Sequence, residues 1–377
     1  MVTHRTGGRG GLMTQTVLSA VRRLLPRIAE AAATVDRDGA VDPAVIESLH
    51  TAGLFGMLRP KEFGGLEADP VEYLTVIREL SAACTSTGWL AGWLGVNTWH
   101  LSLFDARAQH DVWSSDPQPL VCESYAPTGR LERAGDGFRL SGRWSRCTGI
   151  RHASWLMAAA VLVGEDGAAQ DFLVALVPSD DYRVDATWNS VGLRGIGADD
   201  VVVSGAMVPR YRTFGWVSGD QISTLAPLYR LPQPTMYIHT GTVPLLGAAD
   251  CVRAALDPGR GDALGAVGMA GADIDLSVRQ IERNLGDLMA CARAAGSPDT
   301  ELVLRSRRDQ VLAAERAVEA IETFVAHSAG HDAGNAVVER VWRDVQTART
   351  HVASNVEQVL ELVGRHAFGM EVDDILW

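Results

Sequence analysis

The hydrophobic pattern of the chain changes its period twice. Between residues 15 and 35 apolar side chains return every three or four positions, which is typical of an amphipathic helix, and helical signals continue to about residue 115. Near Pro117 short runs of valine, leucine, alanine and aromatic residues begin, separated by turn signals such as Gly135-Asp136-Gly137. The helical period returns past about residue 225. This order predicts an α+β multidomain protein whose parts are helical, β and helical.

The domain boundaries follow these changes of pattern. We expect a disordered leader at 1–13, an N-terminal helical domain at 14–117, a β domain at 118–220 and a C-terminal helical bundle at 221–377. Five strands are expected at 120–124, 137–144, 155–163, 171–177 and 201–208. In the bundle, the stripe that runs from Val311 to Val325 is broad enough to line a helix interface, and 257–271 reads as a loop.

Local signals place the ends of several helices. Asp42-Pro43 has the residue types of an N-cap and a first helical position, and Gly53 those of a helix end. Residues 69–104 carry two further helical stretches that are unusually rich in tryptophan. Pro26 stands inside the first helical pattern and predicts a kink or a break there, because proline removes a helical hydrogen bond.

Composition excludes several classes of function. The formal net charge of −12 argues against nucleic-acid binding, which needs a basic face. The five cysteines are far apart and form no CxxC pair, so neither a disulfide framework nor a zinc site is predicted, and the histidines show no metal-ligand spacing. No apolar stretch approaches the roughly 20 residues that span a bilayer. We therefore expect a cytoplasmic protein with reduced thiols, small organic partners, no metal and no membrane.

Three strings in the chain resemble one family. Residues 140–149 read LSGRWSRCTG, residues 191–195 read VGLRG ahead of Val201-Val202-Val203, and Arg340 is followed by Trp342-Arg343-Asp344. Their order and spacing resemble the acyl-CoA dehydrogenase superfamily over essentially the whole chain. The resemblance implies an N-terminal helical domain, a middle β domain and a C-terminal four-helix bundle, with a flavin between the β domain and the helices.

The C-terminal string favours one branch of that superfamily. Most dehydrogenase branches carry a catalytic glutamate eight residues after the aspartate, because a carboxylate must remove the proton alpha to the thioester. Counting from Asp344 reaches Val352, preceded by His351, and valine accepts no proton. The stretch from Arg340 to Asn355 instead resembles the oxygenase components of 4-hydroxyphenylacetate hydroxylase and secosteroid phenol hydroxylase, together with hydroxylases that tailor aromatic polyketides. In that group a histidine at this place faces the substrate.

The resemblance implies three catalytic candidates. His351 would be the general base that deprotonates a phenol, since imidazole titrates near neutrality and a phenolate carbon is the better nucleophile. Ser124 falls near a serine that the group uses beside the ring system. Asn97 stands where several relatives have histidine, which puts the substrate class in question.

Four further residues are candidates for contact with the flavin. Thr148 matches a position whose hydroxyl reaches the flavin ring, where relatives usually have serine, and a neutral hydroxyl can hold the N5 proton without adding charge. Trp144 and Trp89 are expected to supply apolar walls, and Arg194 to lie near the flavin phosphate or in the loop scaffold. Ile196 and Ala198 replace a threonine and a serine of the relatives.

The resemblance also implies a reaction and its partners. The chain would bind reduced flavin (FMNH2 or FADH2), form a C4a-hydroperoxyflavin with O2, and hydroxylate a phenolic or polyketide-type substrate. No GxGxxG follows a strand, so a separate NAD(P)H-flavin reductase would supply the reduced flavin. A homotetramer is usual for the family. The alternatives are an N-hydroxylase acting on an amine, a flavin-retaining acyl-CoA dehydrogenase, and a non-catalytic binding protein on the same scaffold.

Overall fold

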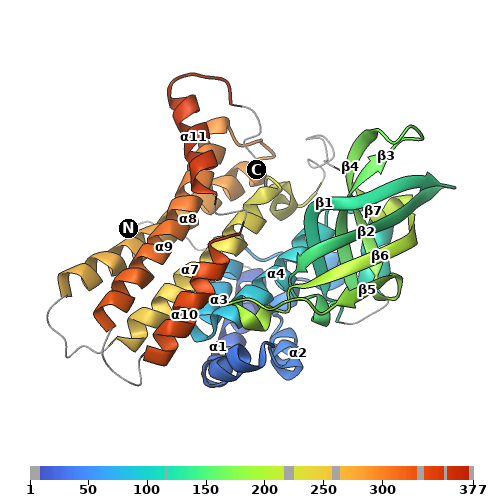
Figure 1. The fold of residues 1–377 in the computed structure, drawn as a ribbon. Coiled ribbons are helices and arrows are strands. Elements are labelled where there is room, and N and C mark those ends of the chain that lie inside the picture. The colour runs from blue at the N-terminus through green and yellow to red at the C-terminus, as the bar shows by residue number, and fades with distance from the viewer. Residues whose placement is uncertain are drawn as a thin grey trace.

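The sheet and the helical bundle occupy opposite ends of the molecule, and the N-terminal helices lie between and beneath them (Figure 1). This computed structural model describes residues 9–114, 118–215, 225–256, 264–328, 335–351 and 355–372. The predicted order of a helical part, a β part and a second helical part is confirmed. Among the described helices, none combines the length and apolar character that crossing a membrane requires.

The N-terminal part consists of helices α1 (Arg9–Asp38), α2 (Pro43–Thr51), α3 (Pro70–Ala83), α4 (Thr85–Leu101) and α5 (Ala106–Trp113). Both predicted signals around α2 are confirmed. The Asp42 carboxylate accepts a hydrogen bond from the Ala44 N–H at 2.8 Å, which satisfies a donor that the first helical turn leaves open. Gly53 has φ 88°, the left-handed conformation in which glycine ends a helix without strain.

Of the kink or break predicted at Pro26, the break does not occur, and part of the predicted leader is helical. Helix α1 runs through Pro26 without a break, and Val21 and Ile28 on either side are 0% and 2% exposed. Their burial offsets the cost of an internal proline, about 3 kcal/mol. The helix also begins at Arg9, so residues 9–13 of the predicted leader are helical. Residues 1–8 lie outside the described residues.

The sheet holds seven described strands in the order β5-β6-β2-β1-β3-β4-β7. They are β1 (Val121–Ala134), β2 (Gly137–Cys147), β3 (Trp155–Val163), β4 (Ala169–Pro178), β5 (Tyr182–Asp185), β6 (Asp199–Pro209) and β7 (Thr213–Phe214). All five predicted strands are present. The sequence missed β5, β7 and the far half of β1, which pairs with β2 up to Ala134. Only the β1–β3 pair among these is parallel, and its register shifts between Ser124 and Gly129.

The C-terminal part contains α7 (Pro234–Ala255), α8 (Leu264–Arg293), α9 (Thr300–Ser328), α10 (Asn335–Ala348) and α11 (Val356–Ala367). Helices α7 to α10 pack side by side, and α11 packs on α9 (Figure 1). The predicted stripe on α9 is confirmed, since Val311 and Phe324 are fully buried. The predicted loop at 257–271 is wrong from Leu264 onward. Glycines 265, 268 and 271 disfavour helix locally, but packing of Ala270 against the bundle overrides that propensity.

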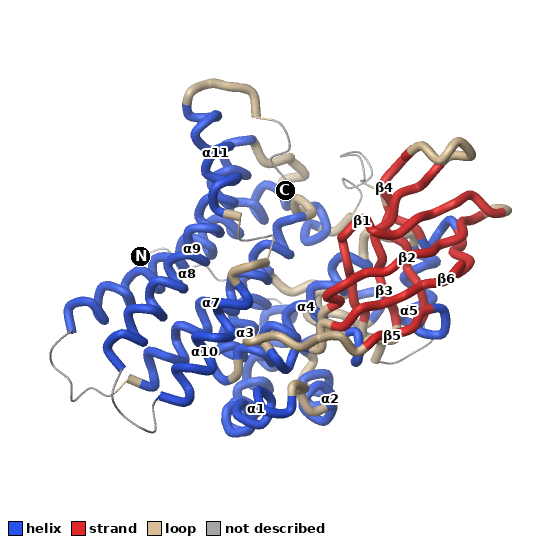
Figure 2. The backbone as a smooth tube through the Cα atoms, viewed as in Figure 1, coloured by secondary structure: helices blue, strands red, loops and turns tan. Residues whose placement is uncertain are grey.

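Helix α4 forms the junction between the sheet and the bundle (Figure 2). All of its residues are buried, so it is apolar on every side, as a helix enclosed by other elements must be. It packs against α3, α7, α10 and β1. Residues brought to α4 by the sheet on one side and by the bundle on the other therefore meet in the interior.

Candidate active site at helix α4

One face of α4 carries the aromatic and polar side chains of the candidate site. Trp89, Trp93, Asn97 and His100 are spaced by four, four and three residues, so they follow one another along that face. Each of the four is at most 7% exposed. The Trp89 and Trp93 rings lie 6.1 Å apart. The other candidate residues lie against this face of α4.

His351 meets this wall from the bundle side. It follows the last turn of α10, with its N–H donating to the Ala348 carbonyl at 3.0 Å. Its ring centroid is 5.0 Å from that of Trp93 and 5.8 Å from that of Trp89. Burial first, and the charge of Arg146 second, lower the pKa of His351 to about 4. The imidazole is therefore neutral at physiological pH, the state in which it can accept a proton.

Thr148 approaches the same helix from the sheet side. It follows β2, and the next residue, Gly149, has φ 78°. A Cβ at Gly149 would lie 2.8 Å from Leu90 and 2.9 Å from Leu94 of α4, so only glycine allows this close approach. Arg146, two residues before Thr148, is near enough to His351 to affect its pKa. The Thr148 turn and His351 thus border one region of α4, at Trp89–Leu94.

Ser124 and Asn97 are both attached to the start of β1. Side chains alternate along a strand, so Ser124 points to the same face as Cys122. The Cys122 thiol lies 3.2 Å from the Thr148 carbonyl oxygen, which places that face beside the Thr148 turn. Asn97 donates from Nδ2 to the Val121 carbonyl at 2.7 Å, whereas its Oδ1 is buried without a hydrogen-bond partner. The amide of Asn97 therefore ties α4 to β1 and leaves one acceptor open.

The structure places Trp144 inside the sheet, and its expected contact with the flavin stays a prediction. Its side chain is 0% exposed and belongs to the hydrophobic core of the sheet. The indole N–H donates to the Ala159 carbonyl at 2.8 Å, and its ring fills the space above Gly129 and Gly142. The sequence could not separate this core role from a site role, because a strand buried on one face and a strand lining a cleft share the same alternation.

Arg194 belongs to the scaffold of the site. Its guanidinium donates to two backbone carbonyls, those of Asp36 at 2.6 Å and of Ser190 at 3.3 Å. Of the two alternatives expected for this residue, a place by the flavin phosphate or in the loop scaffold, these contacts support the second. A guanidinium suits such a role because its planar set of donors can bridge two acceptors at once.

Two of the three sequence strings meet at what we call the α10 junction, formed by Asp36, Gly192, Leu193, Arg343 and Asp344. The Leu193 N–H donates to the Asp344 carboxyl at 2.5 Å. Arg343 forms an ion pair with Asp36 of α1 at 2.7 Å. Burial raises the pKa of Asp344 to about 7. The junction fixes α10, and hence His351, against α1 and the loop.

Sequence reasoning missed a polar cluster at the other end of the α4 face. It consists of His100 on α4, Glu123 and Tyr125 on β1, and Tyr237 on α7. The Tyr125 hydroxyl forms a hydrogen bond with His100 Nδ1, and the Tyr237 ring lies 5.2 Å from the Tyr125 ring and 5.9 Å from the Trp93 ring. The available signal was a lone glutamate, Glu123, at the end of an apolar strand.

The side chains around α4 combine aromatic rings with buried polar atoms. Aromatic walls alternate with buried polar atoms that lack hydrogen-bond partners, namely Trp93 Nε1, Asn97 Oδ1, Glu123 Oε2 and Tyr237 Oη. Buried polar atoms are normally paired, so four open ones on one surface indicate a place for a ligand or water. Thr148, Ser124 and Trp89 are the residues suited to hold a flavin ring. No metal-binding group of His, Cys, Asp or Glu occurs in the described part of the chain.

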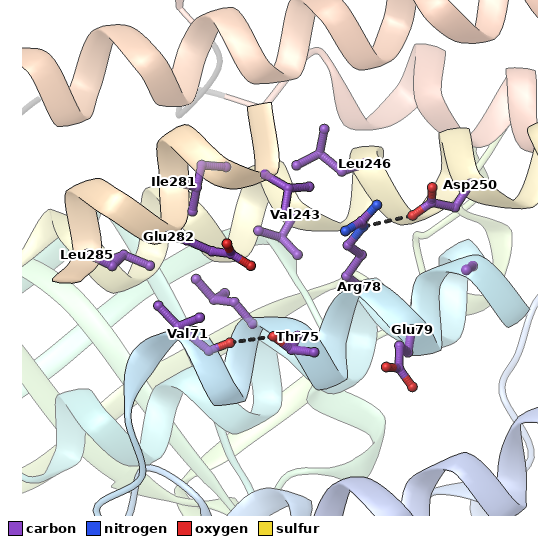
Figure 3. Close-up of a pocket in the computed structure, with 13 residues that line it drawn as sticks. Val71, Thr75, Arg78, Glu79, Val243, Leu246, Asp250, Ile281, Glu282 and Leu285 are labelled. Atoms are coloured by element: carbon purple, nitrogen blue, oxygen red, sulfur yellow. Dashed lines mark hydrogen bonds and ion pairs between the residues drawn. The ribbon is translucent and has the colours of Figure 1, made fainter. Parts of the chain in front are cut away.

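A cavity of about 190 Å³ lies elsewhere, between α3, α7 and α8. Figure 3 shows its lining of mostly apolar side chains, with the ion pair between Arg78 and Asp250 at one end. None of the predicted site residues lines it. A site of reaction is better sought at α4, where titratable groups with shifted pKa values and open polar atoms converge.

Comparison with known proteins identifies the family of the chain. Residues 13–113 match the acyl-CoA dehydrogenase N-terminal domain and residues 263–356 its C-terminal domain. The chain is 34% identical to "Flavin-dependent monooxygenase, oxygenase subunit HsaA" of Rhodococcus jostii, over 94% of this chain and 98% of the relative. It is 31% identical to "FADH(2)-dependent resorcinol hydroxylase, oxygenase component" of a Rhizobium, over 86% and 87% of the two chains.

A solved structure extends this similarity to the fold. The crystal structure of the HsaA monooxygenase from M. tuberculosis superposes with a TM-score of 0.92 at 33% identity, covering 97% of this chain and 100% of that one. Similarity at this level over nearly the full length confirms both the expected fold and the expected branch. The chain belongs to the flavin-dependent monooxygenases, as an oxygenase component built on the acyl-CoA dehydrogenase fold.

Proposed function

We propose that this oxygenase hydroxylates a phenolic or polyketide-type aromatic substrate, with His351 as the general base. The observation that carries the proposal is the His351 imidazole against Trp93 and Trp89, beside the Thr148 turn. A phenol has a pKa of about 10, and its ring carbon becomes a much stronger nucleophile once the proton leaves. The neutral imidazole of His351 lies where it can accept that proton, although the burial that lowers its pKa to about 4 also makes it a weaker base than a free imidazole.

The chain's own residues would divide the remaining tasks. Reduced flavin, when bound, activates O2 for transfer of one oxygen atom to the substrate. We propose that the Thr148 hydroxyl holds the N5 proton of the flavin, that Ser124 lies beside the ring system, and that Trp89 and Trp93 exclude water. Asn97 Oδ1, buried and unpaired, is placed to accept a hydrogen bond from the substrate or the flavin.

The partners are inferred from the relatives and from the surface. We propose FADH2 as the flavin, since one relative is named as FADH2-dependent, and a separate NAD(P)H-flavin reductase as its source. A homotetramer formed through the bundle is supported by exposed apolar side chains along α8, at Leu264, Met269 and Leu276. The five cysteines are free thiols, which suits the reducing cytoplasm.

The proposal is tested by mixing anaerobic protein and reduced flavin with oxygenated buffer and a panel of phenols. Hydroxylated product and H2O2 are measured with FADH2 and FMNH2 in turn. We expect His351→Ala to lower product formation from phenols by at least about 100-fold, the usual contribution of a positioned general base. His366→Ala on α11, where the side chain is exposed, serves as the matched control and should keep full activity.

Two results would redirect the assignment. An unchanged rate in His351→Ala with a phenol that the wild type hydroxylates would remove the base from the proposal. A mild loss combined with turnover of an aromatic amine would favour N-hydroxylation, because a nitrogen lone pair needs no prior deprotonation of the kind a phenol requires.

A further inference from the structure

The polar cluster is an unusual group of side chains to enclose. Tyr237 and His100 are 5% and 2% exposed, and the Glu123 side chain is 9% exposed. A carboxyl group is rarely buried unless it is paired, because its charged form loses the stabilisation that water provides. The buried polar atoms of the cluster should therefore have binding partners.

The contacts within the cluster leave two atoms open. Among the described residues, Glu123 has one ion-pair contact, with His100. His100 Nδ1 lies 3.9 Å from Glu123 Oε2. That separation is beyond hydrogen-bond range, and His100 is already engaged by the Tyr125 hydroxyl. Glu123 Oε2 and Tyr237 Oη are buried without a well-aligned hydrogen bond, although the two groups are close enough for the Tyr237 hydroxyl to act on the Glu123 carboxyl. A ligand oxygen that reached both atoms would give each of them the aligned hydrogen bond that it lacks within the protein.

The surroundings keep the cluster uncharged. Burial lowers the pKa of His100 to about 3, so its ring carries no charge at neutral pH. Burial raises the pKa of Glu123 well above its usual range, although the Tyr237 hydroxyl nearby opposes part of this rise. A protonated carboxyl offers one O–H donor together with an acceptor. The group it suits is an uncharged oxygen function, whereas a ligand carboxylate would bring an unpaired charge into an apolar enclosure.

The cluster is continuous with the proposed reaction site. Trp93 contacts both regions, since its ring lies 5.0 Å from His351 and 5.9 Å from Tyr237, almost parallel to the latter at 22°. An aromatic substrate lying against Trp93 would present one end to His351 and the other to Glu123. The two groups can thus bind opposite ends of one molecule.

We infer that Glu123 and Tyr237 form a second subsite, which hydrogen-bonds an uncharged carbonyl or hydroxyl oxygen of the substrate at the end remote from His351. This inference rests on the proposed function for the identity of the ligand as an aromatic substrate. Glu123 is then a specificity-determining residue. The oxygenase selects substrates with a second, neutral oxygen function and rejects those that carry a carboxylate or only a hydrocarbon group at that end.

The test measures binding to the full-length protein without flavin turnover. Dissociation constants are determined by calorimetry for four para-substituted phenols: 4-hydroxyacetophenone, 4-isopropylphenol, 4-hydroxybenzoate and tyramine. We expect the ketone to bind about tenfold more tightly than the hydrocarbon analogue, as one or two good hydrogen bonds allow, and 4-hydroxybenzoate and tyramine to bind more weakly than the ketone.

Variants of Glu123 and Tyr237 test whether these two residues cause the preference for the ketone. Glu123→Leu should abolish the preference for the ketone, Glu123→Gln should keep most of it because the amide also donates, and Tyr237→Phe should reduce it. Glu132→Gln, an exposed change on the same strand, should leave it intact. Circular dichroism verifies that each variant is folded, and the isosteric Glu123→Gln variant keeps the test decisive if Glu123→Leu does not fold.

Several results would overturn the inference. They are equal affinity of the wild type for the ketone and the hydrocarbon, tightest binding of tyramine with its loss in Glu123→Gln, or no binding of any probe at millimolar concentration. Failure of the proposed function is separate, because it would appear as absence of hydroxylated product while the binding preference persists.

Discussion

The α10 junction and the polar cluster both bury a carboxylic acid, and they use it in different ways. Asp344 is 3% exposed and accepts the Leu193 N–H, so it completes the contact between a loop and α10. Glu123 is similarly enclosed, yet its Oε2 forms no well-aligned hydrogen bond, and the Tyr237 hydroxyl is the side-chain group that acts on it. The comparison separates a buried acid that serves the fold from one that is left available to a ligand.

The largest effect on stability is expected from adding a side-chain atom to the α10 junction, where there is no room for it. In Gly192→Ala the new Cβ would lie 1.9 Å from the Arg343 carbonyl oxygen, so the loop must move away from α10 and lose its bonds to Asp344 and Thr347. We expect a loss of about 3 kcal/mol in the free energy of unfolding. Hydroxylation should fall as well, because His351 follows α10.

Denaturant unfolding and the hydroxylation assay measure these two effects. Gly265→Ala in α8 is the control, since nothing lies within 4 Å of its Cβ position. That variant should be unchanged or slightly more stable, because alanine favours a helix over glycine. Equal stability of Gly192→Ala and wild type would show that the junction does not hold α10 in the way described.

A smaller effect is expected when Asp344 loses its ability to ionise. Its pKa is about 7 in the folded chain and about 3.9 when unfolded. The folded protein therefore holds a proton between these values that the unfolded chain has released, and this contribution to stability falls as pH rises from about 4 to about 7. Asp344→Asn keeps the acceptor for Leu193 and removes the charge, so it should exceed wild type by about 1–3 kcal/mol at pH 8.

The difference between Asp344→Asn and wild type should vanish near pH 4, where both side chains are neutral. Asp38→Asn, which alters an exposed pair with Arg37, should show no such pH dependence. A variant that is less stable than wild type at pH 8 would mean that the ionised carboxylate, supported by Arg340, is the native state.

The sequence predicted where the candidate site lies in the fold better than it predicted which residues belong to that site. The order of elements, the Thr148 turn and the position of His351 all follow from strings with a fixed spacing, and the structure brings them together at α4. The sequence could not show that Trp144 lies in the sheet core, because the local pattern is the same for a tryptophan in the core and one that lines a cleft. Tyr237 was missed because it is one apolar-looking residue in a helix, and only the packing of α7 on α4 places it beside Glu123.

The smallest effect, and the most informative one, is expected when the Glu123 carboxyl group is replaced by a hydrocarbon side chain. Glu123→Leu removes a buried oxygen that lacks a partner, so we expect the free energy of unfolding to rise by about 1 kcal/mol, while the preference for the ketone probe is lost. Asp344→Leu is the matched change at the junction and should destabilise by about 1–3 kcal/mol, because it leaves the Leu193 N–H unpaired. Chemical denaturation of both variants measures the contrast. Destabilisation of the same size at both positions would mean that Glu123, like Asp344, has its partners within the protein, and the distinction between the two acids would then fail.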